Sequence, residues 1–197
     1  MRLPIIFLLA TFLIANSKPQ RPIFKEAIFA GGCFWCMEAA FEKLEGVKSV
    51  VSGYSGGHKK NPKYKEVAAG KTGHKEVVKV TFDSNKINYE KLLVTFWLNV
   101  DPTVKDKQFC DVGSQYASGI FYLNQKQKYL AEKSFERLKA IGFKNIHTSL
   151  EEGREFFQAE ENHQDYYKKN PVRYKFYTHG CGRKKRLEEV WKGKSLQ

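Results

Sequence analysis

The hydrophobic pattern of residues 24–44 changes halfway along, and this change determines where a cysteine must lie. Apolar side chains alternate over 24–30, which is typical of a strand, and Gly31-Gly32 then interrupts the pattern. In the second half they recur at the 3.6-residue spacing of a helix. A strand, a two-glycine turn and a helix are therefore expected, with Cys33 in the first helical turn.

The rest of the chain continues this mixture of patterns without internal repeats. Strands are expected at 47–54, 74–82, 117–123 and 146–151, and helices at 89–100, 125–142 and 159–169, with one helical turn near 64–69. Asn88 is expected to cap the helix at 89–100, and Pro171 to end the last one. Elements in this order predict an α+β two-layer sandwich, a single domain over 24–176.

The first 17 residues have the composition of a signal peptide. Arg2 precedes an apolar run over 3–14, and Ala15-Asn16-Ser17 supplies the small residues of a cleavage site. We therefore expect cleavage after Ser17, a linker over 18–23, and a secreted or periplasmic protein without stable membrane association. An uncleaved anchor is the alternative, although the run is short for a membrane span.

The chain is basic, with 34 Lys and Arg against 21 Asp and Glu and a formal net charge of +13. Part of this charge lies in the C-terminal tail, 177–197, which carries the run Arg183-Lys184-Lys185-Arg186. Such a run suits nucleic acid or an anionic surface, but most are simply solvated. Because an exported protein seldom meets nucleic acid, we expect no nucleic-acid partner.

The sharpest motif is Cys33-Phe34-Trp35-Cys36. Unpaired N–H groups and the helix dipole stabilise a thiolate at a helix start, so the pKa of Cys33 is expected to fall. The two cysteines are consistent with core packing, half of a zinc site, or a redox or nucleophilic site. No second Cys-x-x-Cys follows, which disfavours zinc. Phe34 and Trp35 suit a core or a pocket for a small apolar group.

Polar residues further along the chain are candidates for chemistry at an oxygen atom. Glu76 is the carboxyl on an otherwise apolar strand face, and burial would raise its pKa and keep it protonated, as a general acid requires. Tyr64, Asp111 and Tyr116 flank loops, where functional residues are concentrated. Taken singly, each of the four also has an ordinary surface or packing interpretation.

A series of short motifs, in order along the chain, resembles those of peptide methionine sulfoxide reductase, type A. The motifs are Gly32–Trp35, Gly53–Gly57, Asn61–Tyr64, Gly73–Glu76, Asp101–Thr103, Asp111–Tyr116 and Glu160–Tyr166 with Asn170-Pro171. One such motif is weak, whereas the ordered set is highly specific. The resemblance implies a ferredoxin-like α+β core. It also implies an enzyme that reduces the S epimer of methionine sulfoxide, free or in oxidised proteins, and so repairs oxidative damage.

The resemblance also implies a role for each candidate residue. Cys33 attacks the sulfoxide sulfur and becomes a sulfenic acid as methionine leaves, while Glu76 protonates the sulfoxide oxygen. Tyr64 and Tyr116 hydrogen-bond that oxygen, and Asp111 orients the polar side of the site. The two aromatic residues that follow the nucleophile hold the ε-methyl group. No metal and no organic cofactor are implied.

Recycling needs a second thiol and an external reductant, which the resemblance identifies as thioredoxin or a similar protein. Cys181 is the expected resolving residue, because the glycines beside it would let the tail swing it toward Cys33. Cys36 is the alternative, and Cys110 is expected only to pack. Ala117 stands where family members often have arginine, so the contacts expected there with a peptide backbone are in doubt. We expect a monomer.

A thioredoxin-like disulfide exchanger that uses Cys33 and Cys36 is the rival enzyme. It shares the placement of both cysteines after a strand and a tight turn. The bulky pair Phe34 and Trp35 between the cysteines disfavours it, and the other polar motifs would have no role.

Overall fold

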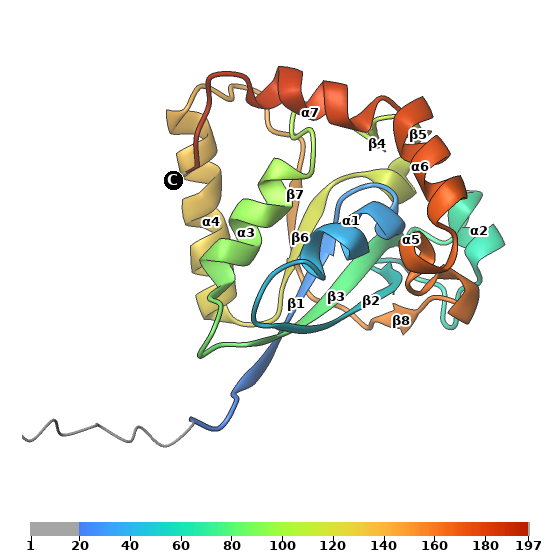
Figure 1. Ribbon diagram of the computed structural model, residues 1–197, viewed down its shortest axis with the longest axis horizontal. Helices are drawn as coiled ribbons and strands as arrows, with labels where there is room; N and C mark the ends of the chain where they lie inside the picture. The colour runs from blue at the N-terminus through green and yellow to red at the C-terminus, as the bar shows by residue number, and fades with distance from the viewer. Residues whose placement is uncertain (1–19, 197) are drawn as a thin grey trace, which may run out of the picture.

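The computed structural model describes residues 20–196, so the predicted leader, 1–17, lies outside the described residues. At its centre is a mixed six-stranded sheet in the order β7-β6-β1-β3-β2-β8, with helices packed against it (Figure 1). Neighbouring strands are antiparallel except β6 and β7, which are parallel. The predicted α+β single domain is confirmed at this level.

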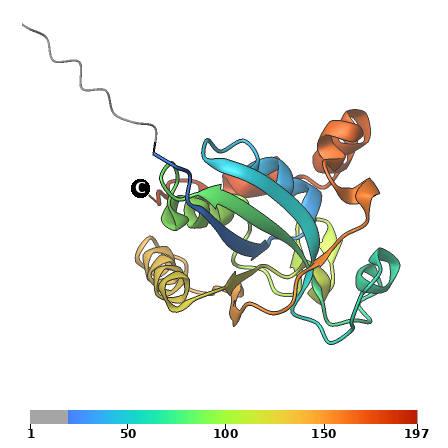
Figure 2. The same ribbon diagram turned by 90° about the horizontal axis from the view of Figure 1, so that it is seen from below.

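The strands that the sequence predicts are all present, with small shifts at their ends. The sheet comprises β1 (Phe24–Ala30), β2 (Val47–Ser55), β3 (Lys75–Asp83), β6 (Gly119–Tyr122), β7 (Ser149–Glu152) and β8 (Phe157–Gln158). A separate hairpin pairs β4 (Lys107–Gln108) with β5 (Asp111–Val112). The three unpredicted strands have two residues each, which is too short for a periodic pattern. Figure 2 shows the long, curved pair formed by β2 and β3.

Helices connect the strands and extend beyond the last one. They are α1 (Phe34–Phe41), α2 (Tyr64–Ala68), α3 (Tyr89–Leu98), α4 (Gln125–Ala140), α5 (Tyr166–Lys169), α6 (Pro171–Gly180) and α7 (Arg183–Trp191), with 3-10 turns η1 (Ser114–Tyr116) and η2 (Glu161–His163). Asn88 caps α3 as predicted, since its side chain accepts a hydrogen bond from the N–H of Lys91.

The predicted helix at 159–169, ended by Pro171, is wrong. The Gln164 side chain accepts from the N–H of Ser52 and donates to the carbonyls of Ser52 and Ala159, so this segment is tied to β2 instead of coiling. It contains the 3-10 turn η2, and only its last four residues form an α-helix, α5. Pro171 begins α6 rather than ending a helix, because the first helical position needs no N–H donor.

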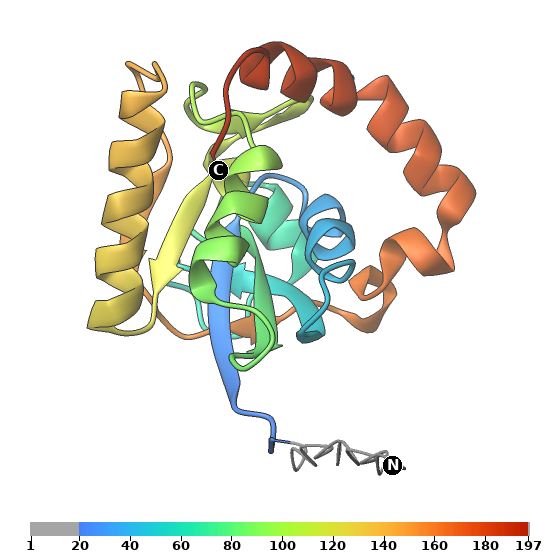
Figure 3. The ribbon, with the colours of Figure 1, turned by 60° about the vertical axis from the view of Figure 1, so that its left-hand side comes forward.

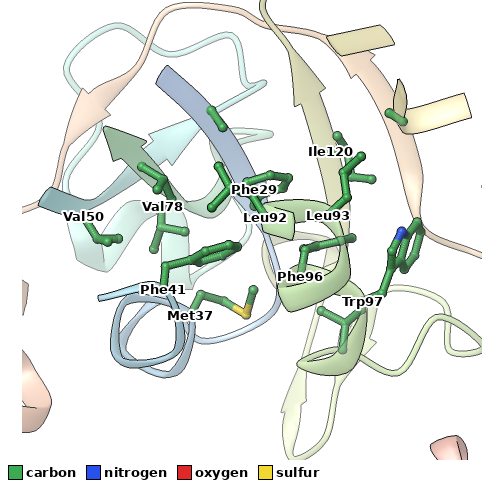
Figure 4. Packing of buried hydrophobic residues seen from close by; sticks show 14 of the residues in the cluster. Phe29, Met37, Phe41, Val50, Val78, Leu92, Leu93, Phe96, Trp97 and Ile120 are labelled. Carbon is green, nitrogen blue, oxygen red and sulfur yellow. The ribbon is translucent and has the colours of Figure 1, made fainter. Parts of the chain in front are cut away.

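One face of the sheet carries the main core, in which Phe29 of β1 is central (Figure 4). Its ring stacks on Phe41 of α1 at 5.0 Å and on Phe96 of α3 at 5.3 Å between centroids. These contacts hold α1 and α3 on the same face of the sheet. Because side chains alternate along β1, the residues beside Phe29 point to the opposite face, where they join a smaller cluster. That cluster contains Ile28, Ala30, Val77 and Phe121.

The C-terminal residues form ordered structure instead of a loose tail. Helices α5, α6 and α7 follow one another in an arc around one side of the molecule (Figure 3). Val190, Trp191 and Leu196 are buried in the main core, and the Trp191 ring lies 5.0 Å from that of Phe143. The predicted domain boundary between 176 and 177 falls within α6.

A disulfide joins Cys110 to Cys181, with a Cα–Cα distance of 4.9 Å. It connects the β4–β5 hairpin to the junction between α6 and α7. The expectation that Cys110 only packs is wrong, because the hairpin turn leaves this residue exposed and facing Cys181. The turn itself requires a positive φ of 55° at Phe109.

None of the helices among residues 20–196 is long and apolar enough to cross a membrane.

The disulfide should stabilise the fold by closing a loop of 71 residues. We expect Cys110→Ser to lower the free energy of unfolding by about 3–4 kcal/mol, as judged by urea denaturation without reductant. Cys181→Ser should cost the same, and the double variant no more than either, because all three break one bond. Two additive losses would contradict the pairing. The unfolded, unreduced wild type should titrate with two free thiols, Cys33 and Cys36.

Glu38 on α1 should make stability depend on pH. Its side chain is buried, Oε1 accepts from the N–H of Asp165, and Oε2 has no hydrogen-bond partner among the described residues. Burial raises the pKa of Glu38 to about 7. A carboxyl with a raised pKa in the folded state destabilises the fold as the pH rises from the unfolded pKa to the folded one.

Glu38→Gln removes this titration. As the pH rises from 5 to 8, wild type should therefore lose unfolding free energy relative to Glu38→Gln. The relative loss should be on the order of 3 kcal/mol. Urea denaturation at both pH values measures it. The exposed Glu45→Gln is the matched control, and an unchanged difference for Glu38→Gln would refute the prediction.

Candidate active site

The turn between β1 and α1 places Cys33 at the N-cap of the helix. Gly32 has a φ of +80°, and a Cβ there would approach the Cβ of Gln108 to 2.5 Å, so only glycine fits. The Cys33 side chain makes no capping hydrogen bond. Both Cys33 and Cys36 are buried, at 5% and 4% exposure.

Glu76 of β3 lies against the same helix start. Its Oε2 accepts a hydrogen bond of 3.1 Å from the N–H of Phe34, the residue after Cys33. The side chain is 2% exposed, and burial raises the pKa of Glu76 to about 8. The carboxyl is therefore protonated at neutral pH, which is the state that a general acid needs.

The other predicted polar residues lie close enough to this carboxyl to interact with it electrostatically. Tyr64 begins α2 and Tyr116 lies in η1, and both are partly buried. Burial, followed by the charge of Glu76, raises the pKa of Tyr64 to about 12 and raises that of Tyr116 as well. Both phenols therefore keep their protons and can donate hydrogen bonds. Burial also raises the pKa of Asp111 on β5.

The two aromatic residues of the motif differ in their surroundings. Phe34 is 1% exposed and packs between rings that include Tyr64. Trp35 is partly exposed and stacks on Tyr166 of α5 with centroids 3.7 Å apart. The Trp35 Nε1 donates to Nδ1 of His163 at 3.3 Å. The segment after β8 therefore fixes the indole ring in place.

Glu160 joins two tyrosines around this aromatic group. Its Oε2 accepts from the Tyr54 hydroxyl at 2.8 Å, and its Oε1 accepts from the N–H of Tyr64 at 2.9 Å. The second bond holds the start of α2 and so positions Tyr64.

Two tyrosines of α6 reach the thiols. The Tyr177 hydroxyl donates to Oδ2 of Asp111 at 2.5 Å, and it lies close enough to Cys33 to lower the pKa of that thiol. Tyr174 hydrogen-bonds Cys36. Because α6 is not predicted from the sequence, Tyr174 and Tyr177 are not among the predicted site residues. Within the linear sequence they are only two of ten tyrosines.

The expectation that the pKa of Cys33 falls is wrong. Burial raises it, and the hydrogen bond to Cys36 raises it further, because the Cys33 thiol donates that bond. The same bond lowers the pKa of Cys36 to about 7, with further help from the Arg183 guanidinium. Within the buried pair a thiolate therefore forms more easily at Cys36 than at Cys33.

Cys181, the expected resolving residue, is bonded to Cys110 in this structure. Cys36, in contrast, is in hydrogen-bond contact with Cys33. A groove of about 930 Å³ runs between α6 and α7, and both Tyr174 and Arg183 line it. Residues 20–196 contain no group of three or more His, Cys, Asp or Glu side chains that could hold a metal ion.

The chain is similar to known proteins over most of its length. Residues 25–195 match the family model described as peptide methionine sulfoxide reductase. The chain is 49% identical over 170 residues to the peptide methionine sulfoxide reductase MsrA of Bacillus subtilis, covering 85% of this chain and 96% of that one. Two solved structures are also similar. Reduced Mxr1 from Saccharomyces cerevisiae has 32% identity and a TM-score of 0.71, covering 76% of this chain and 87% of that one. Methionine sulfoxide reductase A of Corynebacterium diphtheriae has 31% identity and a TM-score of 0.68, covering 77% of each chain.

The chain belongs to the peptide methionine sulfoxide reductase family, and it is a methionine sulfoxide reductase of the MsrA type.

Proposed function

We propose that this enzyme reduces the S epimer of methionine sulfoxide, free or in oxidised proteins, and thereby repairs oxidative damage. One observation carries the proposal. A buried carboxyl that stays protonated to about pH 8, Glu76, is hydrogen-bonded to the backbone next to a buried cysteine. The central strand order β6-β1-β3-β2, with α1 and α3 on one face, supports the ferredoxin-like core that the resemblance implies.

In the first step the Cys33 sulfur attacks the sulfoxide sulfur. Its proton passes along the hydrogen bond to the Cys36 thiolate, which makes Cys33 nucleophilic at the moment of attack. Glu76 protonates the sulfoxide oxygen, which makes the sulfoxide sulfur more electrophilic. Oxygen is transferred to Cys33, so that one thiol and one sulfoxide become one sulfenic acid and one thioether, methionine.

The remaining site residues hold the substrate. Tyr64 and Tyr116 donate hydrogen bonds to the sulfoxide oxygen, whose negative charge grows until it is protonated. Asp111, fixed by the Tyr177 hydroxyl, orients the polar side. The aromatic side chains of Phe34 and Trp35 hold the ε-methyl group.

A second thiol then displaces the oxygen from Cys33. Cys36 is in place for this step, whereas Cys181 must first be released from Cys110. We therefore propose Cys36 as the first resolving residue, with Cys181 as the alternative. Thioredoxin or a similar dithiol protein would reduce the resulting disulfide by thiol–disulfide exchange.

We further propose that the mature protein begins after Ser17 and acts as a secreted or periplasmic monomer. A disulfide between Cys110 and Cys181 is consistent with such an oxidising compartment.

The reaction is tested with racemic methionine sulfoxide, dithiothreitol, and separation of the remaining epimers. Wild type should consume the S epimer alone, and Cys33→Ser should consume neither, because it lacks the nucleophile. Persistence of both epimers with wild type would overturn the proposed function. Reduction of protein disulfides without sulfoxide turnover would favour the rival disulfide exchanger instead.

Glu76 should set the alkaline limit of activity. Its pKa is raised to about 8, so the protonated, active form is lost as the pH rises through that value, and kcat/KM should fall there. Glu76→Gln still accepts a hydrogen bond from Phe34 but has no proton to give, so kcat/KM near pH 7 should drop by about 10²–10⁴-fold. Glu26→Gln, an exposed carboxyl on β1, is the control. Full activity of Glu76→Gln at pH 7 would exclude the general-acid role.

A further inference from the structure

Arg183 is a buried cation without an acidic partner. At 9% exposure its guanidinium donates to the carbonyl of Asn99 at 2.5 Å and contacts Sδ of Met37 at 3.5 Å. Its Cζ lies 4.3 Å from the centre of the Phe109 ring. No carboxylate of residues 20–196 forms an ion pair with it, although Arg186, one turn further along α7, pairs with Asp101 at 2.7 Å.

A buried charge is costly unless an opposite charge compensates it, and the contacts of Arg183 are to neutral groups. Its charge acts on three ionisable groups, Cys36, Asp111 and Tyr174. It helps to lower the pKa of Cys36, and it opposes the increase that burial causes in the pKa of the other two. Met37, which Arg183 touches, is the residue next to Cys36. The guanidinium therefore lies beside the residue that follows Cys36, and it lines the same groove as Tyr174, which also acts on Cys36.

We propose that Arg183 is a positioning residue that supplies the counter-charge for the thiolate of the Cys33–Cys36 pair. This deepens the proposed function, because it rests on Cys36 as the thiol that receives the proton of Cys33 and then resolves the sulfenic acid.

The other groups that act most strongly on the two sulfurs do not supply a positive charge. Glu76 faces them from β3 and Asp111 from β5, and both are acids that disfavour a thiolate. From α6, the Tyr174 hydroxyl acts on Cys36. The Tyr177 hydroxyl, whose proton is donated to Asp111, acts on Cys33, and neither phenol carries a charge at neutral pH. Of these groups in the described chain, Arg183 is the one cation.

The fold holds Arg183 at this position from both sides. It is the first residue of α7, and it follows the disulfide-bonded Cys181 and the left-handed Gly182, whose φ is 62°. Its guanidinium rests on Phe109, which precedes Cys110 in the hairpin turn. The Cys110–Cys181 bond therefore joins the segment that carries Arg183 to the hairpin that supplies Phe109.

The counter-charge matters most when the sulfenic acid is resolved. Cys36 first gives up the proton that it received from Cys33. Its thiolate then donates an electron pair to the sulfur of Cys33, an S–S bond forms, and the S–O bond breaks. Hydroxide leaves and takes up a proton as water, so the sulfur of Cys36 is oxidised and that of Cys33 is reduced. The rate follows the fraction of Cys36 present as thiolate.

The test compares Arg183→Gln, which can still donate to the Asn99 carbonyl, with Arg183→Lys, which keeps the charge. In the resting enzyme, alkylation by iodoacetamide is followed over pH 5–10, and mass spectrometry assigns it to Cys33 or Cys36. Wild type should titrate with a midpoint near 7. Arg183→Gln should raise the midpoint by about one unit, which is about tenfold less alkylation at pH 7, with full recovery at high pH. Arg183→Lys should stay close to wild type.

Single turnovers with methionine sulfoxide, without reductant, test the same charge during resolution. The Cys33–Cys36 disulfide should form about tenfold more slowly in Arg183→Gln at pH 7, and at the wild-type rate at high pH. Lys184→Gln, an exposed cation on the same helix, should change neither measurement. An unchanged midpoint in Arg183→Gln, or equal shifts in Arg183→Gln and Arg183→Lys, would overturn the proposal. Because alkylation needs no sulfoxide, its result stands apart from the proposed function. If Arg183→Gln fails to fold, Arg183→Lys still tests the proposal. This variant keeps the positive charge, so a raised alkylation midpoint in it would contradict the role of Arg183 as a counter-charge.

Discussion

The hydrogen bond from the N–H of Phe34 to the Glu76 carboxyl is the contact on which the site depends. It satisfies one of the backbone donors that the start of α1 leaves unpaired, and it does so with a side chain from the central strand β3. The same bond fixes the distance between the acid and Cys33, one residue earlier. This one hydrogen bond therefore fixes the start of α1 relative to β3, and with it Cys33 relative to Glu76. A shift of α1 along the sheet would separate the nucleophile from its acid.

Burial at this place explains why the thiols behave unlike those of an exposed helix N-terminus. The helix dipole favours a thiolate at Cys33, but desolvation opposes any charge there, and the neighbouring Glu76 opposes it too. The charge is easier to hold one turn further along, at Cys36, where Tyr174 donates a hydrogen bond and Arg183 is close. The same burial that keeps Glu76 protonated thus requires a second thiol or a cation nearby if Cys33 is to lose its proton.

The sequence predicts the centre of the fold well and its C-terminal part poorly, for physical reasons. Helices α3 and α4 bury one periodic face each, and the long strands and α1 are rich in buried apolar residues, so these elements are visible without tertiary information. The segment around Gln164 is irregular because its side chain replaces backbone partners, and this depends on β2, more than a hundred residues earlier. Helix α6 has no fully buried residue, so it carries no apolar stripe that a pattern could reveal. Cys33 and Glu76 are adjacent to regular elements and can be found from the sequence, whereas Tyr174, Tyr177 and Arg183 reach the site only through the return of the chain over α1.

The positions of the four cysteines separate two kinds of sulfur chemistry. Cys33 and Cys36 lie on one helix turn inside the protein, where they can approach each other with little backbone movement. Cys110 and Cys181 join segments far apart in the chain, and Cys110 is exposed. If Cys181 were to resolve Cys33, the bond that places Arg183 and the Asp111 hairpin would have to open in every cycle. Resolution by Cys36 leaves that bond intact, so the charged and hydrogen-bonding groups around the pair keep their positions through the reaction. The geometry therefore favours different roles for the two pairs. Cys33 and Cys36 carry out the redox reaction, and the Cys110–Cys181 disulfide holds the surrounding groups that make the first pair reactive.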